Sequence, residues 1–484
     1  MNMINSVLVS GLVFSFSSFI SAQSPSQLKP ATDQLAGSIY TGPAMATLRE
    51  LTDAYGGRVT GSPSYQRSAE WAAAKFRSYG IQNVRLEPFP IPAGWQRGSA
   101  SGTLISPLPR PLNVASLGWS PSTPAGGVQA AVVAVADVSP QNLKDTEPFR
   151  GKIVLLDTGK IFAEGWAKAL PKLDAAWTVF QQAGVVAAVV TDREKNNVLN
   201  AHDMLWGAKM LPLPVAELGM EDSRLLQRLL EQGPVTIRIA LSNQVAGETQ
   251  VNNVVAEIRG SDRPDEWVLI GAHLDSWDFG TGAQDNGTGA VSVLEAARVL
   301  AALPKAPRRS VRLALWGGEE QGLLGSYAYT EQHRSELGKC VAVLNTDNGA
   351  GHPEGWKVEG RKDLKDAMQP WSNGLLKHLS GEELSLETTY DTDHGPFVLH
   401  GIPSLDLAVD LKQYFEIHHK SSDTIDKVDP LNFKAGAALV AVTAYLLAQT
   451  EKPIAPHLDH KAVGEILKDA KLDELLTYVG VWRP

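Results

Sequence analysis

Cysteine is almost absent from this chain, which has one, Cys340, among 484 residues. A single cysteine excludes an intrachain disulfide and any zinc site built from cysteine thiolates. Cys340 follows the loop of residues 334–339 and begins an apolar segment, so we expect a buried thiol. Without disulfides the fold must rely on its hydrophobic core, and a chain of this length is long enough to bury a large one.

An excess of basic residues is also lacking. Asp and Glu number 53 against 44 Lys and Arg, and the net charge is −9. This acidic balance, with a pI of about 5.7, argues against a nucleic-acid-binding protein. After the first 22 residues, the sequence offers no segment that reads as long and apolar enough to cross a membrane.

The first 22 residues are typical of a signal peptide. Residues 7–20 are apolar with interspersed serines, and Ser21-Ala22 offers a small-residue cleavage site before Gln23. Residues 1–6 contain no Lys or Arg, which departs from the usual start of such a peptide, and a short membrane anchor is the alternative. We therefore expect a secreted or periplasmic protein whose mature form is not bound to a membrane.

Three apolar segments each end in residues of the kind that bind metal ions. Residues 267–272 are continuously apolar, which favours a buried parallel strand, and His273 follows directly. Residues 310–316 predict a second strand before Glu319 and Glu320, and residues 341–346 predict a third that runs into Asp347. Open α/β sheets bind ligands at the carboxyl ends of their strands, so we expect these side chains at one edge of a sheet.

Two further positions complete this set. Asp285 lies 12 residues after His273, in a glycine-rich loop before a helix predicted over residues 289–302. Its two carboxylate oxygens can bridge two cations about 3.5–4 Å apart. His418 and His419 supply a late pair of imidazoles. Imidazole and carboxylate ligands suit zinc, with manganese or cobalt as alternatives.

The neighbouring acids are assigned supporting roles. A carboxylate at Asp275 can accept the second ring N–H of His273, which fixes the tautomer of the imidazole. Of the adjacent glutamates, we expect Glu320 to bind metal and Glu319 to act as general base, because a carboxylate beside two dications can take a proton from water. Ordinary surface acids at loop tips are the structural alternative, and the combination of all these segments argues against it.

The motifs stand in the order His-x-Asp, Asp-Asn-Gly, Gly-Glu-Glu, Asp, and His before Asp-Thr. In this order they resemble the di-zinc aminopeptidase and glutamate carboxypeptidase family, over most of the mature chain. The resemblance implies a zinc-exopeptidase α/β fold, in which a mixed, mostly parallel sheet is flanked by helices. It also implies two Zn²⁺ per chain as cofactors.

The resemblance assigns the ligands to the two ions. His273 and Asp347 would hold one ion, Glu320 and a late histidine would hold the other, and Asp285 would bridge them. Asp275 would orient His273, and Glu319 would be the acid/base. The family places the late ligand four residues before the aspartate of Asp-Thr, which selects His419 and keeps His418 as the second choice.

An inserted domain is a further implication. Residues 150–155, 182–185 and 213–215 resemble a protease-associated domain, a smaller α/β domain inserted within the peptidase domain. The expected division is a signal peptide (1–22), an N-terminal segment of the peptidase domain (23–110), a protease-associated domain (111–246), a longer C-terminal segment of the peptidase domain (247–452) and a helical tail (453–484). In the tail, one amphipathic helix is predicted over residues 462–478, and the His-Leu-Asp-His segment at 457–460 is expected to be structural.

A segment at residues 393–403 resembles one that lines the active site in the same family. His394 is therefore a candidate substrate-binding or supporting residue, with a satisfied loop histidine as the alternative. Tyr390 is a candidate hydrogen-bond donor to the oxyanion, as a tyrosine there is in some relatives, although its spacing departs from the family pattern.

The sequence thus predicts a di-zinc exopeptidase that hydrolyses dipeptides or short peptides, with an aminopeptidase or dipeptidase favoured over a carboxypeptidase. The alternatives are a glutaminyl cyclase-like acyltransferase, which uses one zinc and lacks the inserted domain, and a non-catalytic binding protein of transferrin-receptor type, whose members lose ligands. The expected partner is a peptide substrate. A homodimer is expected only by analogy with relatives.

Overall fold

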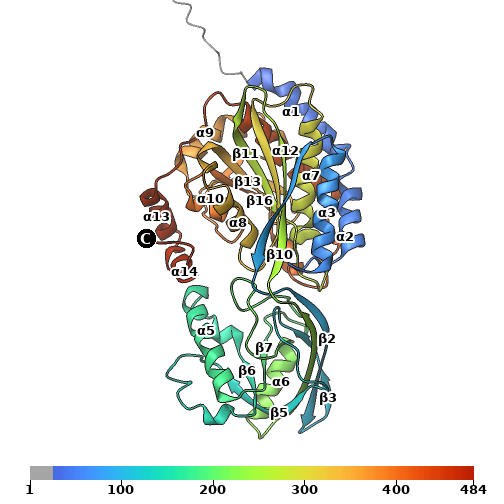
Figure 1. The fold of residues 1–484 in the computed structure, drawn as a ribbon, viewed down its shortest axis with the longest axis vertical. Helices are drawn as coiled ribbons and strands as arrows, with labels where there is room; N and C mark the ends of the chain where they lie inside the picture. Colours follow the sequence, from blue (N-terminus) through green and yellow to red (C-terminus); the bar gives the residue numbers. More distant parts are fainter. Residues whose placement is uncertain (1–24) are drawn as a thin grey trace, which may run out of the picture.

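The structure is a computed structural model and describes residues 25–484, so the predicted signal peptide lies outside the described residues. Figure 1 shows two lobes, each built around its own sheet. The chain passes from the upper to the lower lobe after β1 (Asn83–Ile91) and returns at β10 (Thr249–Ile258).

The upper sheet has eight strands of mixed direction. β11 (Arg263–His273) runs parallel to β12 (Arg309–Trp316) on one side and to β13 (Cys340–Asn345) on the other. Every residue of β11 from Trp267 onward is buried, as the apolar run predicted for a strand covered on both faces. The spatial order is β1, β10, β12, β11, β13, β16 (Ser404–Val409), β14 (Pro353–Lys357) and β15 (Glu383–Ser385).

Helices flank this sheet, which confirms the predicted mixed α/β architecture. In Figure 1, α1, α2, α3 and α7 lie to one side of the sheet, and α8, α9 and α10 to the other. Cys340, at the start of β13, is buried as a free thiol, as predicted. The bounds of the helices are α1 (Pro25–Tyr40), α2 (Ala44–Tyr55), α3 (Pro63–Ser78), α7 (Thr288–Ala301), α8 (Leu324–Gln332), α9 (Lys362–Ser372), α10 (Gly395–Leu399), α11 (Lys412–Ile417) and α12 (Pro430–Gln449).

α12 is longer than the helix predicted over residues 433–447. Its first turn is capped by the carboxylate of Asp429, which accepts hydrogen bonds from the backbone N–H groups of Leu431 and Asn432. With this added length, α12 is the one described helix that is long and apolar enough to span a membrane, which was not predicted from the sequence. Most of it is buried against α7, α1 and β11, which is typical of a core helix.

The lower lobe holds the second eight-stranded sheet. Its order is β3 (Arg110–Leu112), β2 (Trp95–Ser106), β9 (Thr236–Val245), β5 (Val128–Val135), β6 (Ile153–Leu156), β7 (Ala187–Thr191), β8 (Val215–Leu218) and β4 (Val114–Ser116). Three helices accompany it, α4 (Thr158–Ile161), α5 (Trp166–Ala183) and α6 (Met220–Leu230).

The chain enters this second sheet earlier than the predicted boundary at residue 111. β2 already pairs with β9 along most of its length, so the change of sheet falls between Ile91 and Trp95. Residues 95–106 are mainly small and polar, and many are exposed. They therefore offer no alternation of apolar residues from which a strand would be predicted.

The prediction of one tail helix over residues 462–478 was wrong, because the structure has two, α13 (His460–Asp469) and α14 (Asp473–Tyr478). Lys471 adopts a left-handed φ of 59° between them, and the N–H of Leu472 donates to the backbone oxygen of Leu467. This turn lets the chain reverse towards the lower lobe, where the hydroxyl of Tyr478 donates to Asp174 of α5 at 2.5 Å.

The His-Leu-Asp-His segment leads into α13, which starts at its last residue, His460. The carboxylate of Asp459 accepts a hydrogen bond from the N–H of Ala462, and the rings of His457 and His460 contact backbone oxygens of Cys340 and Arg483. These contacts, with the helix cap supplied by Asp459, give the segment the structural role expected from the sequence.

Candidate metal centre

Three predicted ligands meet at the carboxyl ends of β11 and β13. The Nε2 atom of His273 lies 2.9 Å from Oδ1 of Asp347 and 3.2 Å from Oδ1 of Asp285. The Nδ1 atom of the same ring lies 3.0 Å from the backbone oxygen of Asp275. With that contact made, Nε2 is the ring atom that faces the carboxylates and can bind a cation.

A second group forms around the other oxygen of Asp285. The Nε2 atom of His419 lies 2.9 Å from Oε2 of Glu320 and 3.2 Å from Oδ2 of Asp285. His418 stacks on His419, and its Nε2 lies 3.4 Å from the same Oδ2 atom. Of the two histidine side chains, His419 is the less exposed, at 17% against 31%, and it has the contact with Glu320. The geometry therefore favours His419 as the ligand.

Asp285 presents one oxygen to each group. It lies in η2 (Ala283–Gly287), the single turn before α7. The carboxylate of Asp423 accepts hydrogen bonds from the N–H groups of Gln284 at 2.7 Å and Asp285 at 3.1 Å, which fixes this turn. A carboxylate held in this way between two ligand groups suits a bridge between two cations.

Buried carboxylate oxygens without partners test whether the residues fit a metal. Oδ2 of Asp285 and Oε1 of Glu320 are buried, and neither accepts a hydrogen bond with acceptable geometry within residues 25–484. Leaving such atoms without a partner is costly, and a cation would satisfy them. Since the donors are imidazole nitrogens and carboxylate oxygens, the set fits zinc.

Burial and neighbouring charges shift the pKa values of these groups. Burial raises the pKa of Asp347 to about 8 and that of Glu319 well above its usual range. Burial alone would lower the pKa of His419, but Glu320 and Asp285 outweigh it and raise the pKa to about 10. Metal ligands bind in their deprotonated forms, so a dication would displace the protons that these groups otherwise retain.

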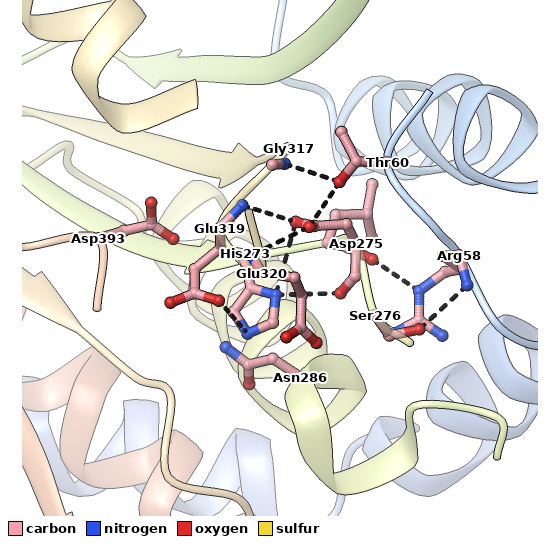
Figure 2. A network of polar contacts seen from close by, with 12 residues as sticks. Arg58, Thr60, His273, Asp275, Ser276, Asn286, Gly317, Glu319, Glu320 and Asp393 are labelled. Carbon is pink, nitrogen blue, oxygen red and sulfur yellow. Dashed lines mark hydrogen bonds and ion pairs between the residues drawn. The ribbon is translucent and has the colours of Figure 1, made fainter. Parts of the chain in front are cut away.

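Glu319 lies beside the group formed by His273, Asp285 and Asp347 but does not belong to it. Its Oε2 atom is 3.9 Å from Nε2 of His273, and 11% of its side chain is exposed. The N–H groups of Glu319 and Glu320 lie 3.3 and 3.4 Å from the carboxylate of Asp275, which also accepts a hydrogen bond from the hydroxyl of Thr60 at 2.7 Å (Figure 2). Asp275 thus holds the loop after β12 against the end of β11.

The contact of Asp275 with His273 differs in one respect from the expectation. Nδ1 of His273 is 3.0 Å from the backbone oxygen of Asp275 but 3.6 Å from its carboxylate. The backbone oxygen is the nearer partner because the Asp275 carboxylate is turned towards the hydroxyl of Thr60 and the N–H of Glu319. Either acceptor fixes the same tautomer of the imidazole.

A buried arginine joins the loops that carry the ligands (Figure 2). Its guanidinium donates to the backbone oxygens of Leu274 (2.6 Å), Thr281 (2.8 Å), Gly282 (2.9 Å) and Gly56 (3.0 Å). This residue, Arg58, therefore ties the segment after His273 to the loop before Asp285. Its side chain fixes the relative position of two ligands that it does not touch.

Two predicted residues lie apart from the ligand groups. The hydroxyl of Tyr390 contacts that of Tyr327, and its ring packs in a hydrophobic cluster with residues of α13 and α14. His394 is buried, with Nε2 3.2 Å from Glu359 and Nδ1 2.7 Å from the hydroxyl of Thr392. Neither belongs to a group of potential metal ligands in the described part of the chain. Their contact with substrate stays a prediction.

Several residues that shape the site were not singled out from the sequence. Arg58 and Thr60 lie in the loop between α2 and α3. In the sequence, Asp423 served only to locate the late histidine ligand, which stands four residues before it. Its Asp-Thr motif was the only sequence pattern that pointed to one of these residues. Arg58 and Thr60 act through loops that meet the ligands only in the folded chain, so no local pattern marks them.

Known proteins share this arrangement of sequence and fold. The model of peptidase family M28 matches residues 253–444, a range that contains every predicted ligand. Carboxypeptidase Q of Mus musculus is 30% identical over 405 residues, which cover 83% of this chain and 85% of that protein. The probable lipoprotein aminopeptidase LpqL of Mycobacterium tuberculosis is 28% identical over 457 residues and 86% of each chain.

Among solved structures, a peptidase M28 precursor from Shewanella amazonensis SB2B is similar throughout. It is 29% identical, with a TM-score of 0.78, over 90% of this chain and 100% of that one. These matches confirm the predicted resemblance and, with it, a zinc-dependent exopeptidase as the class of enzyme. The chain belongs to peptidase family M28.

Proposed function

We propose that this M28 peptidase holds two zinc ions and hydrolyses dipeptides or short peptides from their free amino end. The observation that carries the proposal is the placement of Asp285, whose two oxygens face two separate groups of ligand atoms. In this proposal His273 and Asp347 bind one ion, and Glu320 and His419 bind the other. When bound, the ions supply Lewis acidity for the peptide carbonyl and lower the pKa of water.

Glu319 is the proposed general base. Its carboxylate stands next to the ligands but is not committed to either group, and its N–H is held by Asp275. Burial raises its pKa, which makes it a better proton acceptor than an exposed glutamate. It would take the proton of the attacking water and return it to the leaving amine.

The charge around the ligands favours an amino end over a carboxyl end. Recognition of a terminal carboxylate calls for an available Arg or Lys. Three largely buried basic side chains stand near the loops that carry the ligands: Arg58, Lys420 and Arg97, whose Nε donates to the carboxylate of Asp278 at 2.8 Å. Arg58 donates to backbone oxygens, and Nζ of Lys420 donates to the backbone oxygens of Phe415 and Glu416 at 3.1 Å and lies 2.8 Å from Glu194.

Location and partners are proposed from the sequence. The signal-like start of the chain supports a secreted or periplasmic enzyme, and the acidic balance supports a peptide rather than a nucleic acid as partner. A homodimer stays an expectation by analogy with relatives.

Hydrolysis of a dipeptide panel, before and after chelation, tests the proposal. We expect release of free amino acids that stops with a chelator, returns with zinc and is strongest for unblocked amino ends. Preference for peptides with a blocked amino end and a free carboxyl end would show a carboxypeptidase instead. Cyclisation of an N-terminal glutamine, without peptide hydrolysis, would support the cyclase-like alternative, and absence of any turnover would support the binding protein.

A further inference from the structure

A loop of the lower lobe, residues 200–207, reaches the metal centre. Three hydrogen bonds hold it there: Asn200 Nδ2 to the backbone oxygen of His418 (2.9 Å), Ala201 N–H to that of His419 (2.8 Å) and Gly207 N–H to that of Gln321 (2.9 Å). Gln321 directly follows Glu320. The loop is therefore fixed to both segments that carry the second ligand group.

The base of this loop is anchored to the lower sheet. The N–H of Asn200 donates to the carboxylate of Asp192 at 2.7 Å and lies 3.3 Å from that of Glu217. Asp192 directly follows β7, and Glu217 lies within β8. Because the loop is tied at its base and along its length, a side chain in its middle has a defined position relative to the ligands.

Asp203 occupies that middle position. Its Oδ2 atom is buried and has no hydrogen-bond partner among the residues that the structure describes. Burial raises the pKa of Asp203 well above its usual range, and the negative charge of Glu320 adds to this effect while His419 opposes it. The backbone hydrogen bonds of Ala201 and Gly207 place Asp203 on the stretch of loop between the segments that carry His419 and Glu320, the two proposed ligands of one ion.

We propose that Asp203 binds the ammonium group of the substrate's free N-terminus, so that the inserted lobe supplies the residue that selects unblocked peptides. This assignment rests on the proposed function. An ammonium brings three N–H donors and a positive charge, which together satisfy the buried oxygen and offset its repulsion with Glu320. An N-acylated peptide lacks that charge and leaves the carboxylate without a counterion.

Asp203→Asn removes the charge at nearly constant shape. The wild-type enzyme and this variant are compared on the best dipeptide of the panel and on its N-acetylated form. Asp265→Asn is the matched control, because Asp265 is an exposed acid eight residues before His273, towards the opposite end of β11. Zinc content and thermal unfolding are measured for each protein.

We expect KM for the free dipeptide to rise about 10- to 100-fold in Asp203→Asn, the range of a lost charge-assisted hydrogen bond. Its kcat should change less, since Glu319 and the ligands are untouched. Inhibition by leucinamide should weaken by a similar factor, whereas weak inhibition by N-acetyl-leucinamide should not change. Asp203→Glu, which keeps the charge, should recover part of the preference for the free amine, and Asp265→Asn should behave as wild type.

Other outcomes overturn the assignment. An unchanged preference for the free amine in Asp203→Asn would show that another group binds the ammonium. An equal loss towards free and acetylated compounds would show a structural role, and loss of zinc would make Asp203 a metal ligand. If wild type hydrolyses no peptide at all, the proposed function fails first and this assignment fails with it.

Discussion

Replacement of Arg58 by lysine tests how the ligand loops are held. The guanidinium of Arg58 is buried and donates to four backbone oxygens on three segments, at residues 56, 274 and 281–282. Lysine keeps the positive charge but has a single nitrogen in place of the planar fork. One ammonium cannot reach oxygens on all three segments, and we expect it to keep at most two of the four hydrogen bonds.

The cost follows from the lost bonds. A hydrogen bond to a charged group contributes about 1.5–3 kcal/mol, so two lost bonds predict a loss of about 3–6 kcal/mol in the free energy of unfolding. Burial already lowers the pKa of Arg58 to about 10, despite the nearby carboxylates of Asp423 and Asp275. A lysine starts from a lower pKa than arginine and would lose its proton more readily here, which weakens its remaining bonds.

Urea unfolding of Arg58→Lys and wild type, each with and without zinc, measures this loss. The zinc-free comparison isolates the fold, and the comparison with zinc adds the effect on the metal centre. Arg49→Lys is the matched control, because Arg49 is exposed on α2. A loss below about 1 kcal/mol in Arg58→Lys, or one equal to that of the control, would refute the role given to the four hydrogen bonds.

Three further predictions concern single side chains. Glu319→Gln should lower kcat by about 10²- to 10⁴-fold with zinc content unchanged, and full activity would exclude Glu319 as the base. His419→Gln should lose one zinc ion and most activity whereas His418→Gln keeps both, and the opposite result would exchange the two roles. Burial alone would lower the pKa of His394, but Glu359 raises it to about 9. The pair therefore stabilises the fold fully below the unfolded pKa of about 6.5, and this contribution of up to about 3 kcal/mol is lost as the pH rises through 9. His394→Gln should remove that fall, and an unchanged slope in unfolding free energy against pH would contradict it.

The region of the fold that could be predicted is the one with buried parallel strands. β11 is covered on both faces, so it has a continuous apolar run, and the ligand His273 stands at its end. Parallel strands bring their carboxyl ends to one edge, which is why ligands from separate segments could be expected together. β2 gave no such signal because its residues are small, polar and often exposed.

The supporting residues could not be predicted for a different reason. Arg58 binds backbone oxygens, which every residue provides, so no sequence pattern marks its partners. Asp203 is brought between the segments that carry Glu320 and His419 only because the loop of residues 200–207 docks on the other lobe. The break in the tail helix depends on a left-handed Lys471, a conformation that lysine does not signal in sequence.

Zinc-edge anomalous diffraction from crystals of the zinc-loaded enzyme would locate the ions. We expect two peaks on either side of the Asp285 carboxylate, one beside His273 and Asp347 and the other beside Glu320 and His419. A single peak, or a second zinc bound away from Asp285, would contradict a two-zinc centre bridged by this residue.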